Sequence, residues 1–163
     1  MLRALQFYIT RVASNWIVLF VKSMDAPASF TVPLIWFLLQ LMKGFWTILL
    51  LVFSNTFMTF AWYGQLKMRE FKWFQALPLF AIILMSWAVA FFEYSLMVPA
   101  NRMGFKANGG PFSLVQLKVF QEAITLMVFI IFSVTFFKNE PLKTNHFMGF
   151  VFLLLAVYFI FKD

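Results

Sequence analysis

The sequence contains no cysteine and a single histidine, and it is poor in charge. Only 12% of its 163 residues are charged, with six acidic residues against thirteen lysines and arginines. Without cysteine the chain has no disulfide framework, thiol chemistry or cysteine-based metal site. A lone histidine, His146, argues against a histidine-cluster metal site or a histidine-containing triad within one chain. We therefore predict no metal, no cofactor and no catalytic residues.

Apolar side chains dominate instead. Hydrophobic residues make up 63% of the chain and aromatic residues 21%, whereas a soluble domain is about half apolar and about one quarter charged. Residues 77–92, 123–137 and 147–161 carry no charge. Extended by a few polar residues, such runs reach the ~20 residues that cross a hydrocarbon core about 30 Å thick. The composition predicts an integral membrane protein.

The net charge of +7 does not indicate a nucleic-acid-binding protein. The basic residues lie in the segments between apolar runs and form no stripe that could track phosphates. Placement beside the ends of apolar runs is typical of membrane spans. We expect the lipid bilayer as a partner, and no nucleic acid.

Four spanning helices are predicted, which gives an all-α fold, an integral membrane four-helix bundle. The spans lie near residues 45–66, 77–98, 112–137 and 145–161. Pro99 is predicted to stop the second helix, because proline disfavours the helical conformation of the preceding residue. The stretch "NGGP" at 108–111 predicts a turn. Ser113 and Gln116 have the spacing of a capping box that opens the third helix.

The first 41 residues are predicted to be an N-terminal extension to a four-helix domain of residues 42–163. Residues 1–22 lack acids and weakly resemble an amphipathic targeting or interfacial segment. Residues 31–42 are apolar but too short to span a membrane, and Lys43-Gly44 is predicted to break them from the next helix. "MKGFWTILLL", from Met42, reads like a natural start of a bacterial membrane protein. The extension is therefore either accessory or an upstream translation artefact.

Ionisable side chains fall inside the predicted spans. A charge at the bilayer centre costs at least about 2.5–3.5 kcal/mol, so such residues usually face a bundle interior or water. At about 1.5 Å of rise per residue, Glu122 lies roughly 15 Å into the third helix, Lys118 roughly 9 Å, and Glu93 roughly 8 Å from the end of the second. The second and third helices are expected to be antiparallel neighbours. We therefore predict that Lys118 lies between the carboxylates of Glu93 and Glu122.

The polar residues of the third helix share one face. Lys118, Gln121, Glu122 and Thr125 follow the i, i+3, i+4, i+7 spacing. We predict that Glu93, Lys118, Glu122 and Gln121 handle protons or substrate, because intramembrane ionisable residues are functional by default. The alternative is a buried ion network that fixes helix register without doing chemistry.

Further candidates lie on the first helix. Asn55 and Thr59 form a second polar face, and Trp62 and Tyr63 offer aromatic faces that could hold an organic cation. All four are candidates for substrate contact. For Asn55 the alternative, an interhelical hydrogen bond, is favoured. His146 is predicted to cap the fourth helix or contact headgroups.

Four stretches of the chain are distinctive when taken together: "SNTFMTFAWYGQLK" (54–67), "PANRMG" (99–104), "GPFSLVQLKVFQEAITLMVF" (110–129) and "AVYFIFK" (156–162). With them the sequence resembles a family of small bacterial four-helix membrane proteins, domain-of-unknown-function family 486, which is grouped with the drug/metabolite transporter superfamily. The resemblance extends over essentially all of residues 43–163 and does not include residues 1–41.

The resemblance implies a transporter-like protein with the size of small multidrug resistance exporters, which have four short helices and work as antiparallel dimers. Their coupling glutamate lies in the middle of helix one, where this chain carries Ser54, Asn55 and Thr56. Their mechanism is therefore not carried over, and the substrate class stays open.

We expect a small secondary transporter of the bacterial inner membrane that moves a small solute coupled to protons or ions. It is expected to act as a homodimer, with an antiparallel arrangement as one option. In this hypothesis Glu122 binds the proton, Glu93 is a gate or second carrier, and Asn55 contacts the solute. The alternative is a non-transporting accessory or assembly protein with a structural ion network. No enzyme is predicted, because no nucleophile–base pair or ligand cluster occurs.

Overall fold

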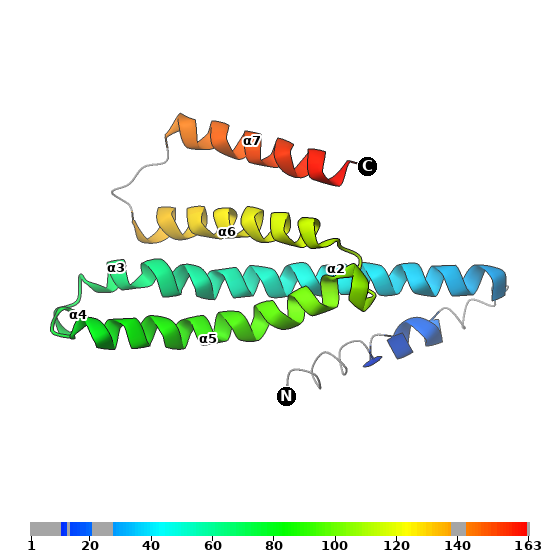
Figure 1. Ribbon diagram of the computed structural model, residues 1–163, viewed down its shortest axis with the longest axis horizontal. Helices are drawn as coiled ribbons and strands as arrows, with labels where there is room; N and C mark the ends of the chain where they lie inside the picture. Colours follow the sequence, from blue (N-terminus) through cyan, green and yellow to red (C-terminus); the bar gives the residue numbers. More distant parts are fainter. Residues whose placement is uncertain (1–10, 13, 21–27, 138–142, 163) are drawn as a thin grey trace.

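A computed structural model describes residues 11–12, 14–20, 28–137 and 143–162. The secondary structure of this part is helical, as predicted, apart from one isolated bridge between Phe105 and Phe112 (Figure 1). Residues 1–10, 13, 21–27, 138–142 and 163 lie outside the described part, and so does much of the predicted extension. The named helices are α2 (Ala28–Thr59), η1 (Phe60–Gly64), α3 (Gln65–Met68), α4 (Lys72–Gln75), α5 (Leu79–Gly104), η2 (Lys106–Asn108), α6 (Leu114–Phe136) and α7 (Thr144–Phe161).

Three helices of the described chain are long and apolar enough to cross a membrane. They are Val32–Met68, which joins α2, η1 and α3, Leu79–Gly104 (α5) and Leu114–Phe136 (α6). α7 is apolar but shorter. The first three predicted spans therefore coincide with helices of sufficient length, and the fourth span stays a prediction that rests on the sequence.

α2 continues through Lys43 and Gly44, so the predicted break at this pair is wrong. Glycine inside a helix costs only about 1 kcal/mol relative to alanine. At Gly44 the absence of a side chain also leaves room for residues of another segment to pack against the helix. A Cβ atom at Gly44 would lie 3.5 Å from both Pro111 and Phe112. The loop between α5 and α6 thus packs directly on α2, and Lys43 Nζ donates to the carbonyl of Gly109 at 2.7 Å.

The N-terminal part of α2 projects beyond the loop that joins α5 and α6 (Figure 1). Its apolar side chains include Trp36, 64% exposed, and Phe37, 55% exposed. The predicted boundary between residues 1–41 and 42–163 therefore falls within one continuous helix. The part on the N-terminal side of the boundary contributes little to the packed bundle.

α5 passes through Pro99 and ends at Gly104, so the predicted stop at this proline is wrong. Membrane helices tolerate proline because neighbouring helices and local adjustments satisfy the freed backbone groups. Pro99 is itself buried, and Ala100 beyond it has no exposed surface. Glu93 consequently lies about 16 Å from the end of the helix instead of about 8 Å, which places it near the middle of α5.

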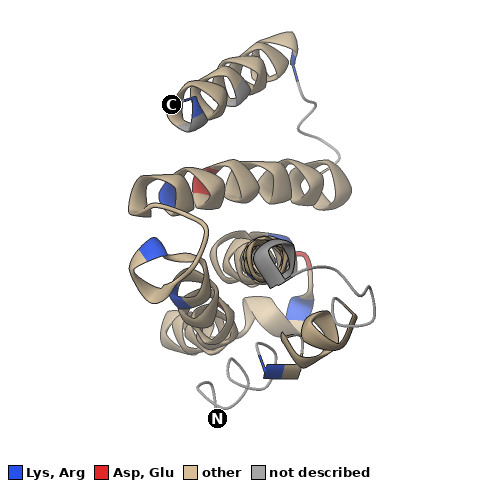
Figure 2. Ribbon diagram, turned by 90° about the vertical axis from the view of Figure 1, so that its right-hand side faces the viewer, with Lys and Arg blue, Asp and Glu red and all other residues tan. Residues whose placement is uncertain are grey.

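α2 is the central helix of the bundle. It packs against α5 on one side and α6 on another, while α7 packs on α6, as the two ribbon views show (Figures 1 and 2). A small apolar core contains one residue from each of the three long helices, namely Leu51, Ala100 and Ile124. α5 and α6 are antiparallel, as predicted, but most of their contacts are made to α2 and not to each other.

The predicted turn and capping box between α5 and α6 are confirmed. Gly109 has a φ of 73°, the left-handed conformation that glycine adopts readily. The side chain of Ser113 accepts from Gln116 N at 3.2 Å, and Gln116 Oε1 accepts from Ser113 N at 2.9 Å. This loop is therefore a defined structure that fixes where α6 starts.

Candidate functional site

Polar side chains make contacts between α2 and α5 and between α2 and α6 in the interior of the bundle, and we call them together the central polar cluster. They are Ser54 and Asn55 of α2, Glu93 of α5, and Gln121 and Thr125 of α6. Consecutive residues of an α-helix point about 100° apart. Ser54 can therefore face α5 while Asn55 faces α6, and one dipeptide serves both interfaces of the central helix.

Glu93 is the ionisable member of this cluster. Its side chain is 1% exposed, and Ser54, fully buried, donates its hydroxyl to Oε1 at 3.3 Å. Oε2 is buried and has no hydrogen-bond partner within the described part of the chain. Neither of the two ion pairs formed by the described residues includes Glu93. An ionisable group inside a membrane without a compensating cation is costly, which makes Glu93 a candidate for function.

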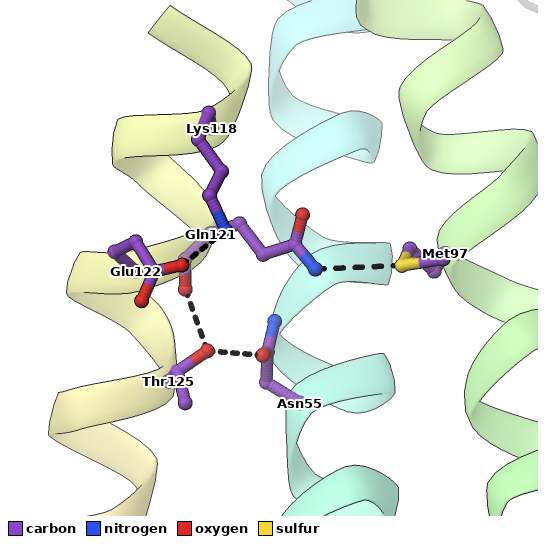
Figure 3. Close-up of polar contacts among 6 residues, drawn as sticks. All are labelled: Asn55, Met97, Lys118, Gln121, Glu122 and Thr125. Atoms are coloured by element: carbon purple, nitrogen blue, oxygen red, sulfur yellow. Dashed lines mark hydrogen bonds and ion pairs between the residues drawn. The ribbon is translucent and has the colours of Figure 1, made fainter. Parts of the chain in front are cut away.

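Asn55 links α2 to α6 (Figure 3). The side chain is 4% exposed; Nδ2 donates to the carbonyl of Leu51 at 2.8 Å, and Oδ1 accepts from the hydroxyl of Thr125. The predicted interhelical hydrogen bond of Asn55 is thus confirmed. The Thr125 hydroxyl also lies 2.7 Å from the carbonyl of Gln121. Because a hydroxyl has one hydrogen, it can serve only one of these acceptors at a time.

Gln121 extends from α6 toward α5 (Figure 3). Its Nε2 lies 3.4 Å from the Sδ atom of Met97. A thioether sulfur is a weak acceptor. The amide of Gln121 is therefore held loosely enough to exchange this partner for a stronger one.

Lys118 and Glu122 form an ion pair, as predicted, but they lie on the outside of α6. Their side chains are 67% and 57% exposed. Glu93 is on the other side of the cluster and hydrogen-bonds to Ser54, so the predicted placement of Lys118 between two carboxylates is wrong. The polar stripe on α6 is about 100° wide; Gln121 and Thr125 occupy the edge toward α2, and Glu122 occupies the far edge.

The other predicted contact residues do not join the cluster. Thr59 is 3% exposed, but its hydroxyl donates to the carbonyl of Asn55 within the same helix at 2.8 Å. Trp62 is 53% exposed, and the ring of Tyr63 packs against Phe129 with centroids 4.9 Å apart. Trp62 and Tyr63 lie on the π-helical turn η1, a feature that is frequent at functional sites and that nothing in the sequence indicated.

His146 caps α7, as predicted. Its Nδ1 accepts from the backbone N–H of Lys143 at 3.1 Å. No group of three or more His, Asp or Glu side chains that could hold a metal occurs among residues 11–12, 14–20, 28–137 and 143–162. His146 therefore has a local structural partner at the helix start.

Within residues 28–137, one cavity is described at each end of the bundle. The junction pocket, of about 300 Å³, lies where α5 meets α6 and is lined in part by Arg102, Lys118 and Gln121. The other, of about 600 Å³, is lined in part by Arg69 and Gln75. Glu93 lines neither of them. The sequence predicted neither the contact of Ser54 with Glu93 nor the pocket around Arg102. The basic residues that follow Pro99 could have indicated the pocket.

One protein-family model matches residues 47–161, and its description reads "Putative member of DMT superfamily (DUF486)". The match contains the whole central polar cluster and starts inside α2. No curated protein and no solved structure matches the chain.

Proposed function

The chain belongs to the DUF486 family, and from this premise we propose that it is a small secondary transporter in which Glu93 binds the coupling proton. The observation that carries the proposal is the buried carboxyl group of Glu93, near the middle of a spanning helix, with Oε2 unpartnered within the described part. Ionisable residues in such places mark ion and proton pathways. The family's grouping with a superfamily of transporters supports the same function.

This proposal moves the proton-binding role from Glu122 to Glu93. Glu122 is more than half exposed and already paired with Lys118. To take up a proton, Glu122 would have to give up this contact with Lys118. Glu93 has only the hydroxyl of Ser54 as a described partner, so no ion pair has to break when it binds a proton.

The order of residues on α2 offers a way to couple proton binding at Glu93 to solute binding at Asn55. Ser54 contacts Glu93, and Asn55, next in the chain, contacts Thr125. A protonated carboxyl group becomes a hydrogen-bond donor as well as an acceptor, so proton binding changes the contact with Ser54. A resulting shift of α2 changes the contact between Asn55 and α6. We propose that the solute hydrogen-bonds to Asn55 and Gln121 in place of their exchangeable partners.

The pathway to Glu93 in this proposal lies between two protomers. Glu93 lines neither of the two cavities described within residues 28–137, and transporter sites form at the interface between repeats or halves. The chain acts as a homodimer in this proposal, in an antiparallel arrangement if both orientations insert. The bacterial inner membrane is the proposed location, and no enzymatic role is proposed.

A second candidate function is that of a non-transporting accessory or assembly protein. The observation that favours it is again that neither described cavity is lined by Glu93. In this case the central polar cluster fixes the register of α2 against α5 and α6 without moving a proton.

Proton-coupled flux into proteoliposomes distinguishes the two functions. A panel of small solutes is tested with an imposed pH gradient, comparing wild type, Glu93→Gln and Glu122→Gln. Glu70→Gln is the matched control, since Glu70 is exposed and paired with Lys67. If the chain is a transporter, wild type should show solute flux driven by the pH gradient. Glu93→Gln should abolish this flux, whereas Glu122→Gln and Glu70→Gln should retain it. Gradient-driven flux at the wild-type rate in Glu93→Gln contradicts the proposal, and absence of flux for every solute favours the accessory function.

A further inference from the structure

The junction pocket has a chemistry different from that of the central polar cluster. Its volume of about 300 Å³ is at the lower end of the range of ligand sites, which is about 300–1,000 Å³. It lies where α5 ends and α6 begins. Gln121 belongs to the pocket and to the cluster, and the other lining residues belong to the pocket alone.

The polar lining of the pocket carries two cations and no carboxylate. The cations are Arg102 and Lys118, and the amides of Asn101, Asn108 and Gln121 complete the polar set. Neither ion pair formed within the described part includes Arg102, so its five N–H donors are available. Lys118 contacts Glu122, which does not line the pocket, and an ammonium group has two further donors. The lining therefore suits a group that is anionic and rich in acceptors.

The remaining walls of the pocket are apolar. Phe105, Leu114 and Leu117 line it together with the cations. Leu114 is the first residue of α6, and Gln121 lies about 10 Å deeper along the helix. The pocket therefore runs from the level at which the helix starts into the edge of the apolar layer. A small hydrated anion makes no use of such walls, whereas a phosphate carried by an apolar chain does.

The backbone at this junction is fixed in advance of binding. The amide of Lys106 donates to the carbonyl of Phe112, and the amide of Phe112 donates to the carbonyl of Gly104, each at 2.8 Å. Asn108 Nδ2 donates to the backbone carbonyl of Arg102 at 3.1 Å. Figure 2, viewed from this end of the bundle, shows basic residues gathered around the junction. Lys43 and Lys106 add positive charge beside the pocket.

We propose that the junction pocket binds one phosphate group carried by an apolar chain, with Arg102 and Lys118 as its cationic contacts. Arginine matches phosphate with two parallel N–H donors, and lysine acts as a point charge. Basic pockets between transmembrane helices bind the headgroups of anionic lipids, so a bilayer phospholipid is the source of the phosphate that this lining fits. The inference is independent of transport, because it requires no change at Glu93.

Native mass spectrometry of the purified full-length chain in detergent tests the proposal. The probes are phosphatidylglycerol, phosphatidylcholine and glycerol 3-phosphate, each titrated separately. Wild type is expected to retain phosphatidylglycerol about tenfold more tightly than phosphatidylcholine, since the choline cation of phosphatidylcholine would be repelled by Arg102 and Lys118. Glycerol 3-phosphate, which has no apolar chain, is expected to bind more weakly than phosphatidylglycerol; if it binds as tightly, the apolar walls contribute nothing and the proposal is overturned.

The variants are chosen so that none leaves a new unpaired charge. Arg102→Gln changes an exposed side chain, and Lys118→Gln combined with Glu122→Gln removes the ion pair as a unit. Lys72→Gln, exposed at the opposite end of the bundle, is the matched control. Each pocket variant is expected to lose about tenfold in phosphatidylglycerol retention, with unchanged thermal unfolding in lipid-free detergent, and the control to lose none. Equal retention of both lipids by wild type, or wild-type retention by both pocket variants, overturns the proposal.

Discussion

Alanine at Gly104 should separate helices that the wild-type chain brings into close contact. Gly104 ends α5 and lies against Thr47 of α2 and Leu117 of α6. A Cβ atom there would lie 2.6 Å from Thr47 Cγ2 and 2.9 Å from Leu117 Cδ2, closer than such atoms can approach without movement. Thr47 has no exposed surface, and its hydroxyl donates to the carbonyl of Lys43 at 2.7 Å, which restricts its rotation.

The expected cost follows from this geometry. Adding a methyl group to a packed interior costs about 1–3 kcal/mol, so Gly104→Ala should lower the free energy of unfolding by that amount. Thr47→Ser removes the methyl group that the new Cβ would meet and keeps the hydroxyl. The double variant should therefore lose less than the sum of the two single variants, as expected for residues in contact.

The measurement is reversible unfolding in mixed micelles with increasing sodium dodecyl sulfate, followed by circular dichroism. Gly149→Ala in α7 is the matched control, because a Cβ atom there meets nothing within 4 Å. It should change the free energy of unfolding by no more than about 1 kcal/mol, the difference in helix propensity between the two residues. If Gly104→Ala is as stable as wild type, the close approach of α2, α5 and α6 at this point is wrong.

Three further predictions concern the cluster, the extension and the topology. A double-mutant cycle of Asn55→Ala and Thr125→Val should give a coupling of about 0.6–1.7 kcal/mol in the same unfolding assay, the range of interhelical hydrogen bonds in membranes; no coupling contradicts the contact. A chain that starts at Met42 should insert and fold, because the removed part of α2 projects beyond the bundle; degradation of this chain, with the full-length chain stable, would place residues 1–41 in the fold. Reporter fusions at Asp163 of the chain that starts at Met42 should show both orientations, since its short loops carry nearly equal basic charge on the two sides; Arg3, Arg11 and Lys22 can tip this balance in the full-length chain, and a single orientation of the shortened chain counts against the antiparallel dimer.

The positions of the long helices could be predicted because apolar composition determines them directly. The places where prediction failed are those where packing overrides a local rule. Pro99 and Gly44 are breakers by local propensity, yet the helices pass through both residues. At Gly44 the absent side chain admits Pro111 and Phe112, and this contact could not be found before the loop had been placed in space.

The candidate site could be predicted only in part for a related reason. Helical spacing shows which residues share a face, but it does not show which edge of that face meets a neighbour. Lys118 and Glu122 lie on the exposed edge, and Gln121 and Thr125 on the inner one. The predicted depth of Glu93 in the membrane was counted from the predicted end of α5. Because that end was wrongly placed at Pro99, Glu93 was predicted to lie level with Lys118, and Lys118 was wrongly predicted to be its partner. The pairing of Ser54 with Glu93 depends on the rotation of α2, which composition does not determine.

Covalent labelling with dicyclohexylcarbodiimide tests most directly whether Glu93 is the proton-binding carboxyl group inside the membrane. The reagent is apolar and reacts with protonated carboxyl groups in apolar surroundings, and peptide mass spectrometry identifies the labelled residue. We expect that in proteoliposomes Glu93 is labelled, that Glu122 is not, and that Glu93→Gln removes the label. Labelling of Glu122 with Glu93 unmodified would contradict this expectation.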